Sequence, residues 1–109
     1  MATPHVGSCE VVSLPGLCSD VMHATTQALM KSRQLEIVRI VLHAGKNLPE
    51  HQVEGELTLQ CLKGLCVLAT PERTVSLKEG DWVHLQAHEP HALTAVTDTV
   101  MLLTLRLPD

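Results

Sequence analysis

Aromatic residues are almost absent from this 109-residue sequence, which has no phenylalanine, no tyrosine and one tryptophan, Trp82. Proteins that bind single-stranded nucleic acid stack bases on aromatic side chains along a positively charged groove, and duplexes are bound largely through Lys and Arg contacts to phosphate. Here eight Lys and Arg are scattered along the chain and are outnumbered by twelve Asp and Glu. We therefore expect no nucleic-acid partner.

Long apolar runs are also missing. No segment approaches the roughly 18 consecutive apolar residues that suggest a membrane-spanning helix, so no membrane partner is expected. The first ten residues, "MATPHVGSCE", lack the positive charge followed by an apolar run that a signal peptide needs. The expected location is the cytoplasm.

The sequence has no Cys-x-x-Cys pair, which argues against a thiolate zinc knuckle or a thioredoxin-like site. Its four cysteines, Cys9, Cys18, Cys61 and Cys66, are expected to be reduced thiols that pack as small hydrophobic groups. In "CLKGLC" the Lys63-Gly64 dipeptide is suited to a two-residue hairpin turn. Such a turn would place Cys61 opposite Cys66, close enough for a disulfide, and their redox state is left open.

Short runs rich in Val, Leu, Ile and Thr make up about half of the chain, separated by turn residues every eight to twelve positions. Apolar residues account for 45% and charged residues for 18%, which is typical of a globular domain. The pattern predicts an all-β sandwich or barrel. The expected strands are Glu10–Leu14, Gln27–Lys31, Leu35–His43, Leu57–Leu62, Leu65–Ala69, Thr74–Leu77, Trp82–Gln86, Leu93–Thr97 and Thr99–Leu107. The last of these runs consists mostly of apolar residues, as expected of a strand covered on both faces.

The N-terminal thirty residues allow a second interpretation. Behind a Ser19 cap, Val21, Ala24, Ala28 and Leu29 would line one face of a short helix over Ser19–Met30. We describe the chain as a single domain, with an N-terminal arm over 1–34 and a barrel core over 35–109.

Two segments of the sequence resemble the motifs of the cupin family. The first family motif runs Gly, five residues, His, one residue, His, three or four residues, Glu, six residues, Gly. In this chain Gly45, His51 and Gly64 match it. The second motif runs Gly, five residues, Pro, one residue, Gly, two residues, His, and here Gly80 opens "GDWVHLQAHEPH" and His91 takes the histidine position. The resemblance implies a cupin-like double-stranded β-helix, a jelly-roll barrel, over most of the chain.

The resemblance also implies a metal held inside the barrel by His, His, Glu and His, and this sequence departs from that set. Val53 stands at the second His position and Leu57 at the Glu position, so only His51 and His91 remain. In the second motif Gln86 replaces the Pro and His88 the Gly. A catalytic metal centre generally keeps three protein ligands, and two imidazoles alone bind a metal weakly. The residues nearby that could complete a set for Fe, Mn, Ni or Zn are Glu54, Glu56 and His88, the glutamates by an inward bulge at Gly55.

The cavity expected around His51 and His91 is aliphatic, since Phe and Tyr are absent. Small barrels can hold a small ligand in their interior. The residues expected to line this cavity are Val53, Leu57, Leu59, Val83, Leu85, Leu93 and Met101. His5 and His23 are expected at the surface and His43 in a structural role, while strand alternation does not decide the direction of His84.

Three functions compete at this point. The first is a barrel that binds a small molecule, with His51 and His91 as hydrogen-bonding groups. The second is a metal-dependent cupin enzyme, an oxygenase or isomerase, with an incomplete or substituted ligand set. The third is a structural dimer whose role lies in its partners, and exposed sheet edges favour a homodimer in any case. No catalytic residue and no substrate can be named from the sequence.

Overall fold

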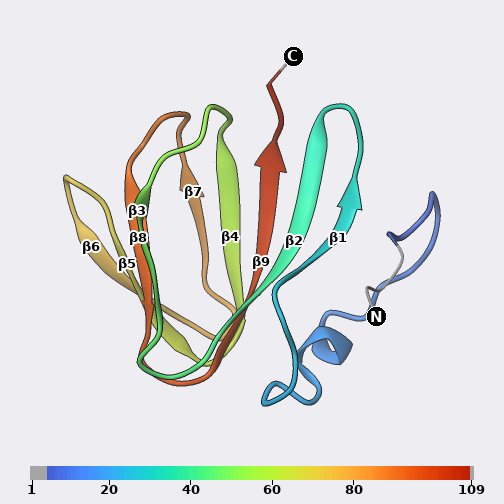
Figure 1. Ribbon diagram of the computed structural model, residues 1–109, viewed down its shortest axis with the longest axis horizontal. Helices are drawn as coiled ribbons and strands as arrows, with labels where there is room; N and C mark the ends of the chain where they lie inside the picture. Colours follow the sequence, from blue (N-terminus) through green and yellow to red (C-terminus); the bar gives the residue numbers. More distant parts are fainter. Residues whose placement is uncertain (1–4, 109) are drawn as a thin grey trace.

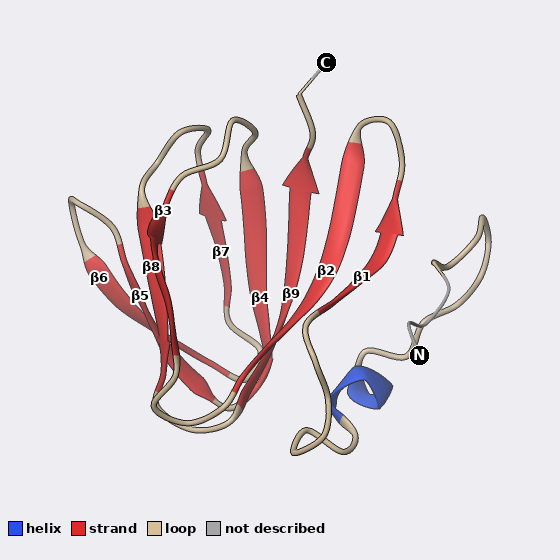
Figure 2. Ribbon diagram, viewed as in Figure 1, coloured by secondary structure: helices blue, strands red, loops and turns tan. Residues whose placement is uncertain are grey.

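Two antiparallel sheets account for about half of residues 5–108, the part of the chain that the computed structural model describes. Figure 1 shows them facing each other, with the N-terminal arm beside one of them. Figure 2 shows the strands of both sheets in red and the short helical turn of the N-terminal arm in blue. The elements are η1 (Pro15–Cys18, a 3₁₀ helix), β1 (Gln27–Lys31), β2 (Leu35–Leu42), β3 (Asn47–His51), β4 (Leu57–Lys63), β5 (Leu65–Ala69), β6 (Thr74–Lys78), β7 (Trp82–Leu85), β8 (His91–Ala95) and β9 (Thr99–Arg106).

The strand order is that of a jelly-roll barrel. One sheet runs β1-β2-β9-β4-β7 and the other runs β3-β8-β5-β6. Neighbours in the chain such as β4 and β5 lie in different sheets, and β9 returns to the middle of the first sheet between β2 and β4. The prediction of an all-β, double-stranded β-helix is confirmed.

Alternating burial along the strands builds the core between the sheets. In β4, Leu57, Leu59 and Cys61 are buried while the residues between them are partly exposed. In β8, Leu93 and Ala95 are buried in the same alternating way. A side-chain period of two puts these residues on the inner faces, and full burial of a leucine contributes about 1.5–3 kcal/mol. These inner faces also form the walls of the cavities described below.

The strand β9 is covered on both faces only over its first three residues. Thr99, Val100 and Met101 are fully buried, whereas Leu102–Leu105 are partly exposed. The expectation of a strand covered along its whole length is therefore correct only for the part of β9 nearest the arm.

The helix expected over Ser19–Met30 is wrong. Asp20 has a φ of 52°, in the left-handed region that a right-handed helix does not use. The helical turn lies earlier, at η1, and β1 forms instead because it pairs with β2 along the sheet edge. The strand expected over Glu10–Leu14 does not form either, whereas β3, which is not among the expected strands, does.

The hairpin expected at Lys63-Gly64 is also wrong. Gly64, with a φ of 91°, is where the chain crosses from one sheet to the other, and a Cβ there would collide with the Asp98 carbonyl oxygen. Cys61 therefore pairs with Met101 in β9, whereas Cys66 pairs with residues of β6 and β8. Both thiols are free and buried, and Cys66 Sγ lies 3.5 Å from Met101 Sδ.

No helix within residues 5–108 has the length and hydropathy for a membrane span.

Candidate functional site

His51 and His91 meet at one end of the barrel. His51 is the last residue of β3 and His91 the first of β8, and the two are direct partners across the antiparallel ladder. Their ring centroids lie 4.4 Å apart, with the ring planes tilted by 56°. His91 is buried, with 4% of its surface exposed, while His51 is exposed. The two segments that carry the motif histidines are thus brought together by strand pairing.

Backbone carbonyls hold both imidazoles in the same tautomer. The Nδ1–H of His51 donates to the carbonyl of Pro49 at 3.2 Å, and the Nδ1–H of His91 donates to that of Glu89 at 3.0 Å. Because a carbonyl oxygen only accepts, Nδ1 must carry the hydrogen, and in a neutral ring Nε2 then has the lone pair. Within the described residues neither Nε2 has a partner. Each histidine therefore offers one hydrogen-bond acceptor to a ligand.

These rings form part of the wall of an aliphatic cavity of about 260 Å³. Thr26 contributes the one hydroxyl in the lining, and its Oγ1 is already engaged with the backbone of Val41. The imidazoles are thus the polar side chains in the wall that are free to bind a ligand. The lining consists of Thr26, Val38, Ile40, Leu48, His51, Val53, Leu57, Leu59, His91, Leu93, Leu103 and Leu105.

The residues expected around this cavity divide into two groups. Val53, Leu57, Leu59 and Leu93 line it. Val83 and Leu85 do not, because β7 lies at the far edge of its sheet, where they line a separate groove. Met101 is fully buried in the core against Cys66 and lines neither space.

Several lining residues were missed at the sequence level. They come from β2, β3 and β9 and from the segment before β1: Val38, Ile40, Leu48, Leu103, Leu105 and Thr26. Alternation within "QLEIVRIVL" and "TVMLLTLRL" was a usable signal for an inner face. It did not show which strands would lie opposite the histidines, because that depends on long-range register.

The donor set does not fit a catalytic metal centre. Val53 and Leu57, at the positions where the motif has His and Glu, line the same cavity as the two histidines. The register of the motif is therefore kept while two ligands are replaced by hydrocarbon. No group of three or more His, Cys, Asp or Glu able to hold a metal ion occurs within residues 5–108.

The residues considered as substitute ligands lie elsewhere. Glu54 and Glu56 line a different depression beside Arg106, and Glu56 Oε2 lies 3.4 Å from His84 Nε2. His88, in the loop between β7 and β8, lines a third depression. The glutamate loop is held against the end of β9, since Arg106 N–H donates to the Glu56 carbonyl at 3.1 Å. This contact keeps the two glutamates out of the cavity lining, and no inward bulge supplies a carboxylate.

Gly55 makes that close approach possible. A Cβ at this position would collide with the carbonyl group of Arg106. The glycine that was expected to let a carboxylate turn inward therefore packs the loop against β9 instead.

Comparison with known proteins locates this architecture in a fold family. No protein-family model matches the sequence, and no curated protein matches it at a significant level. Among solved structures, a conserved protein of unknown function from Streptococcus pyogenes is 25% identical, with a TM-score of 0.80 over 100% of this chain and 96% of the other. An RmlC-like cupin from Methanocaldococcus jannaschii with a double-stranded β-helix fold is 19% identical, with a TM-score of 0.74 over 81% of this chain and 84% of the other. The chain has the fold of a small cupin-type domain.

A third structure extends the match along nearly the whole cupin domain. An RmlC-like cupin from Desulfovibrio desulfuricans is 24% identical, with a TM-score of 0.69 over 95% of this chain and 96% of the other. At such identities the likeness of the named cupins shows the fold alone. The chemistry of the cupin domain must therefore be argued from its own side chains.

Proposed function

We propose that this cupin domain binds a small, mainly apolar molecule that carries a hydroxyl group. The observation that supports this function is the pair of imidazoles beside an aliphatic cavity, each with Nδ1 held by the backbone and Nε2 without a protein partner. A hydroxyl that enters the cavity donates to a lone pair on Nε2, while the hydrocarbon part of the ligand contacts Leu59 and Leu93. The two contacts together determine the orientation of the ligand.

The size of the cavity limits the ligand. Clefts for drug-sized molecules are roughly 300–1,000 Å³, and an apolar cavity of about 150 Å³ accommodates benzene. At about 260 Å³ this space is suited to a single substituted ring or a short branched chain. Burial of that hydrocarbon supplies the favourable free energy, at about 25 cal/mol per Å² of apolar surface.

The metal-dependent alternative receives less support from the same residues. An Fe, Mn, Ni or Zn ion would have only His51 and His91 as protein ligands, with Leu57 where a carboxylate would neutralise the charge. The backbone-held Nδ1 atoms are an arrangement that metal-binding histidines also use. This arrangement orients two ligands and does not supply a third. We therefore propose that the domain binds a small molecule and derive no metal-dependent reaction.

Binding of phenol and benzene tests the proposal, because the two probes differ in one hydroxyl. Amide NMR titration of the intact domain should show saturable shifts at Val53 and Leu93 for both, with phenol bound more tightly. A net hydrogen bond of about 0.5–1.5 kcal/mol predicts that His51→Leu weakens phenol about two- to tenfold and leaves benzene nearly unchanged. His5→Leu, at an exposed position in the arm, is the matched control.

A second variant addresses the cavity itself. Val53→Phe should fill it and abolish the shifts caused by both probes. Phenol binding that survives Val53→Phe, or that falls equally in His5→Leu and His51→Leu, would contradict the proposal.

A further inference from the structure

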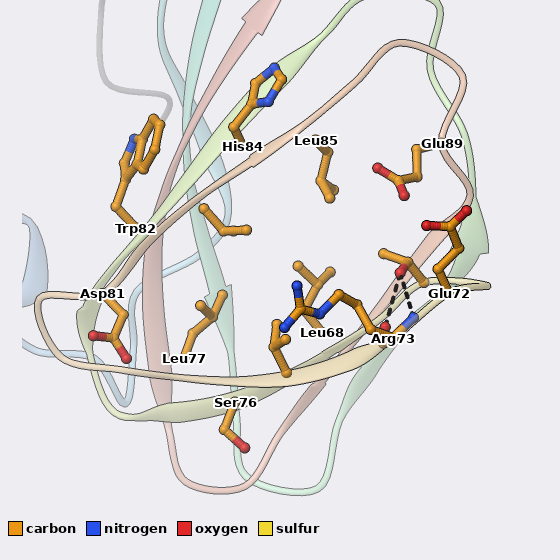
Figure 3. A pocket seen from close by; sticks show the side chains of 13 residues that line it. Leu68, Glu72, Arg73, Ser76, Leu77, Asp81, Trp82, His84, Leu85 and Glu89 are labelled. Carbon is orange, nitrogen blue, oxygen red and sulfur yellow. Dashed lines mark hydrogen bonds between the residues drawn. The ribbon is translucent and has the colours of Figure 1, made fainter.

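A second depression, of about 420 Å³, is lined mainly by residues of β6 and β7. It forms where the chain turns from β6 to β7, which are the outer strands of different sheets and diverge after the turn. Figure 3 shows the space between the two strands with its lining side chains. The two depressions have no lining residue in common. A ligand in this groove would therefore contact neither imidazole directly, although the Glu89 carbonyl at its rim also accepts the His91 Nδ1–H.

The floor of the groove is aliphatic. Leu68, Leu77 and Leu85 are 1%, 4% and 5% exposed, and Val75 and Val83 complete the apolar surface. In Figure 3 the side chains of Leu68, Leu77 and Leu85 lie around the space between β6 and β7. Such a floor favours contact with a hydrocarbon group.

The rim carries charges of both signs that have no protein partner. Within the described residues the side chains of Glu72, Arg73 and Glu89 form neither an ion pair nor a hydrogen bond. Asp81 differs, since it lies 3.5 Å from the Lys78 ammonium and accepts the Lys78 N–H at 3.0 Å. The groove thus offers one guanidinium and two carboxylates that are free to bind a ligand.

The turn between β5 and β6 positions Glu72 and Arg73, whereas Glu89 comes from the loop between β7 and β8. Thr70 closes the turn between β5 and β6, because its N–H donates to the Arg73 carbonyl at 2.9 Å and its hydroxyl donates to the same oxygen at 2.9 Å. In Figure 3 the Arg73 side chain extends over the groove, while Glu72 and Glu89 stand together at one side. Trp82, 61% exposed, lies at the opposite rim.

We propose that this groove binds a zwitterionic amino acid with a large apolar side chain. The carboxylate pairs with the Arg73 guanidinium, whose planar fork matches it. The ammonium binds between Glu72 and Glu89, and the side chain lies on the leucine floor. A simple anion would face two carboxylates and a simple cation would face the guanidinium, whereas a zwitterion finds an opposite charge for each of its own.

L-Phenylalanine is the probe for this site. Trp82 is the only tryptophan, so its fluorescence, excited where phenylalanine does not absorb, reports on the rim of the groove. In the intact domain we expect L-phenylalanine to quench or enhance the Trp82 fluorescence in a saturable way. Amide NMR shifts should change in β6 and β7 and not at Val53. N-acetyl-L-phenylalanine, which lacks the ammonium, and L-phenylalaninamide, which lacks the carboxylate, should each bind at least about tenfold more weakly, because each loses one charge-assisted contact.

Variants then assign the contacts. Arg73→Gln should weaken the binding of L-phenylalanine about tenfold or more and leave that of L-phenylalaninamide little affected. Glu89→Gln should weaken the binding of L-phenylalanine and leave that of N-acetyl-L-phenylalanine little affected. Arg33→Gln, at an exposed arginine in the turn between β1 and β2, should bind as the unaltered domain does. The absence of a saturable signal, equal binding of all three probes, or equal loss in Arg33→Gln and Arg73→Gln would overturn the proposal.

Discussion

His51 and His91 show how a single backbone contact determines what a side chain can do. Each ring uses Nδ1 to bind a carbonyl two residues earlier in the chain, at Pro49 and at Glu89. That local contact selects the tautomer and leaves Nε2 as an acceptor. The hydrogen-bonding chemistry of the candidate site therefore depends on the two loop backbones as much as on the imidazoles.

A prediction at the same scale concerns the thiols. Burial, together with a smaller effect of the neighbouring Cys61, raises the pKa of the Cys66 thiol to about 11. Two units above the value of 9.0 for an unperturbed thiol leave about a hundredfold less thiolate near pH 8. In the native domain iodoacetamide should therefore modify the exposed Cys9 first and Cys66 last, as followed by peptide mass spectrometry.

The pH dependence of iodoacetamide labelling tests whether the raised pKa of Cys66 is the cause of its slow reaction. Labelling of Cys66 should accelerate as the pH rises towards 11 while circular dichroism shows the fold intact. After unfolding in urea, Cys66 and Cys9 should react at similar rates. Equal rates in the native domain at pH 8 would contradict the burial of Cys66.

At the scale of elements, the pairing of β3 with β8 and the segment leading into β4 bring four motif positions to one cavity. His51 and His91 are ladder partners, and Val53 and Leu57 line the same space. The barrel has thus retained the arrangement of a four-ligand site while two of the four side chains are apolar.

This arrangement predicts that ligands can be restored. The double variant Val53→His, Leu57→Glu would place three imidazoles and a carboxylate around the cavity, enough for a zinc ion. After loading and dialysis we expect about one zinc per chain by elemental analysis, and a higher unfolding temperature with zinc than without, because a buried unpaired carboxylate is costly. The unaltered domain should retain much less.

The matched control places the same residues at neighbouring positions outside the cavity. Gln52→His, Thr58→Glu should gain neither bound zinc nor zinc-dependent stability, since neither position lines the cavity. Equal retention of zinc by both double variants would show that the four positions do not converge as described.

On the scale of the whole molecule, the N-terminal arm covers one outer face of the barrel. Val41 and Val100 are buried, yet they stand outside the core cluster, and they are partners across the β2–β9 ladder. Their neighbours Ile40 and Met101 belong to the core, so alternation turns the two valines outward. In the arm, η1 packs against β4, the strand that pairs with the other edge of β9.

Removal of residues 1–18 should therefore destabilise the domain without altering its histidine cavity. Exposure of one valine costs about 1.5–3 kcal/mol, so we expect a loss of that order in the free energy of unfolding measured with urea. Binding of phenol should remain within about twofold, because the cavity lining begins at Thr26. Unchanged stability, or loss of phenol binding, would contradict this role of the arm.

Much of the fold and part of the site could be predicted from local patterns. Alternating apolar residues predicted eight of the nine strands in approximate position, apart from β3, and the motif spacing predicted that His51 and His91 approach each other. The failures share a cause. The helix over Ser19–Met30, the hairpin at Lys63-Gly64 and the placement of Val83, Leu85 and Met101 in the cavity rested on local sequence, whereas strand pairing decided each outcome.

The sequence by itself determined that the chain forms short strands and that two imidazoles and many aliphatic side chains are available for a site, because side-chain period and turn chemistry are local properties. Only the tertiary structure decided which residues share a cavity. Strand order and register are long-range features, and they placed Leu103 and Leu105 beside the histidines and turned Glu54 and Glu56 away from them. They also left Arg73, Glu72 and Glu89 around a second groove that shares no lining residue with the histidine cavity.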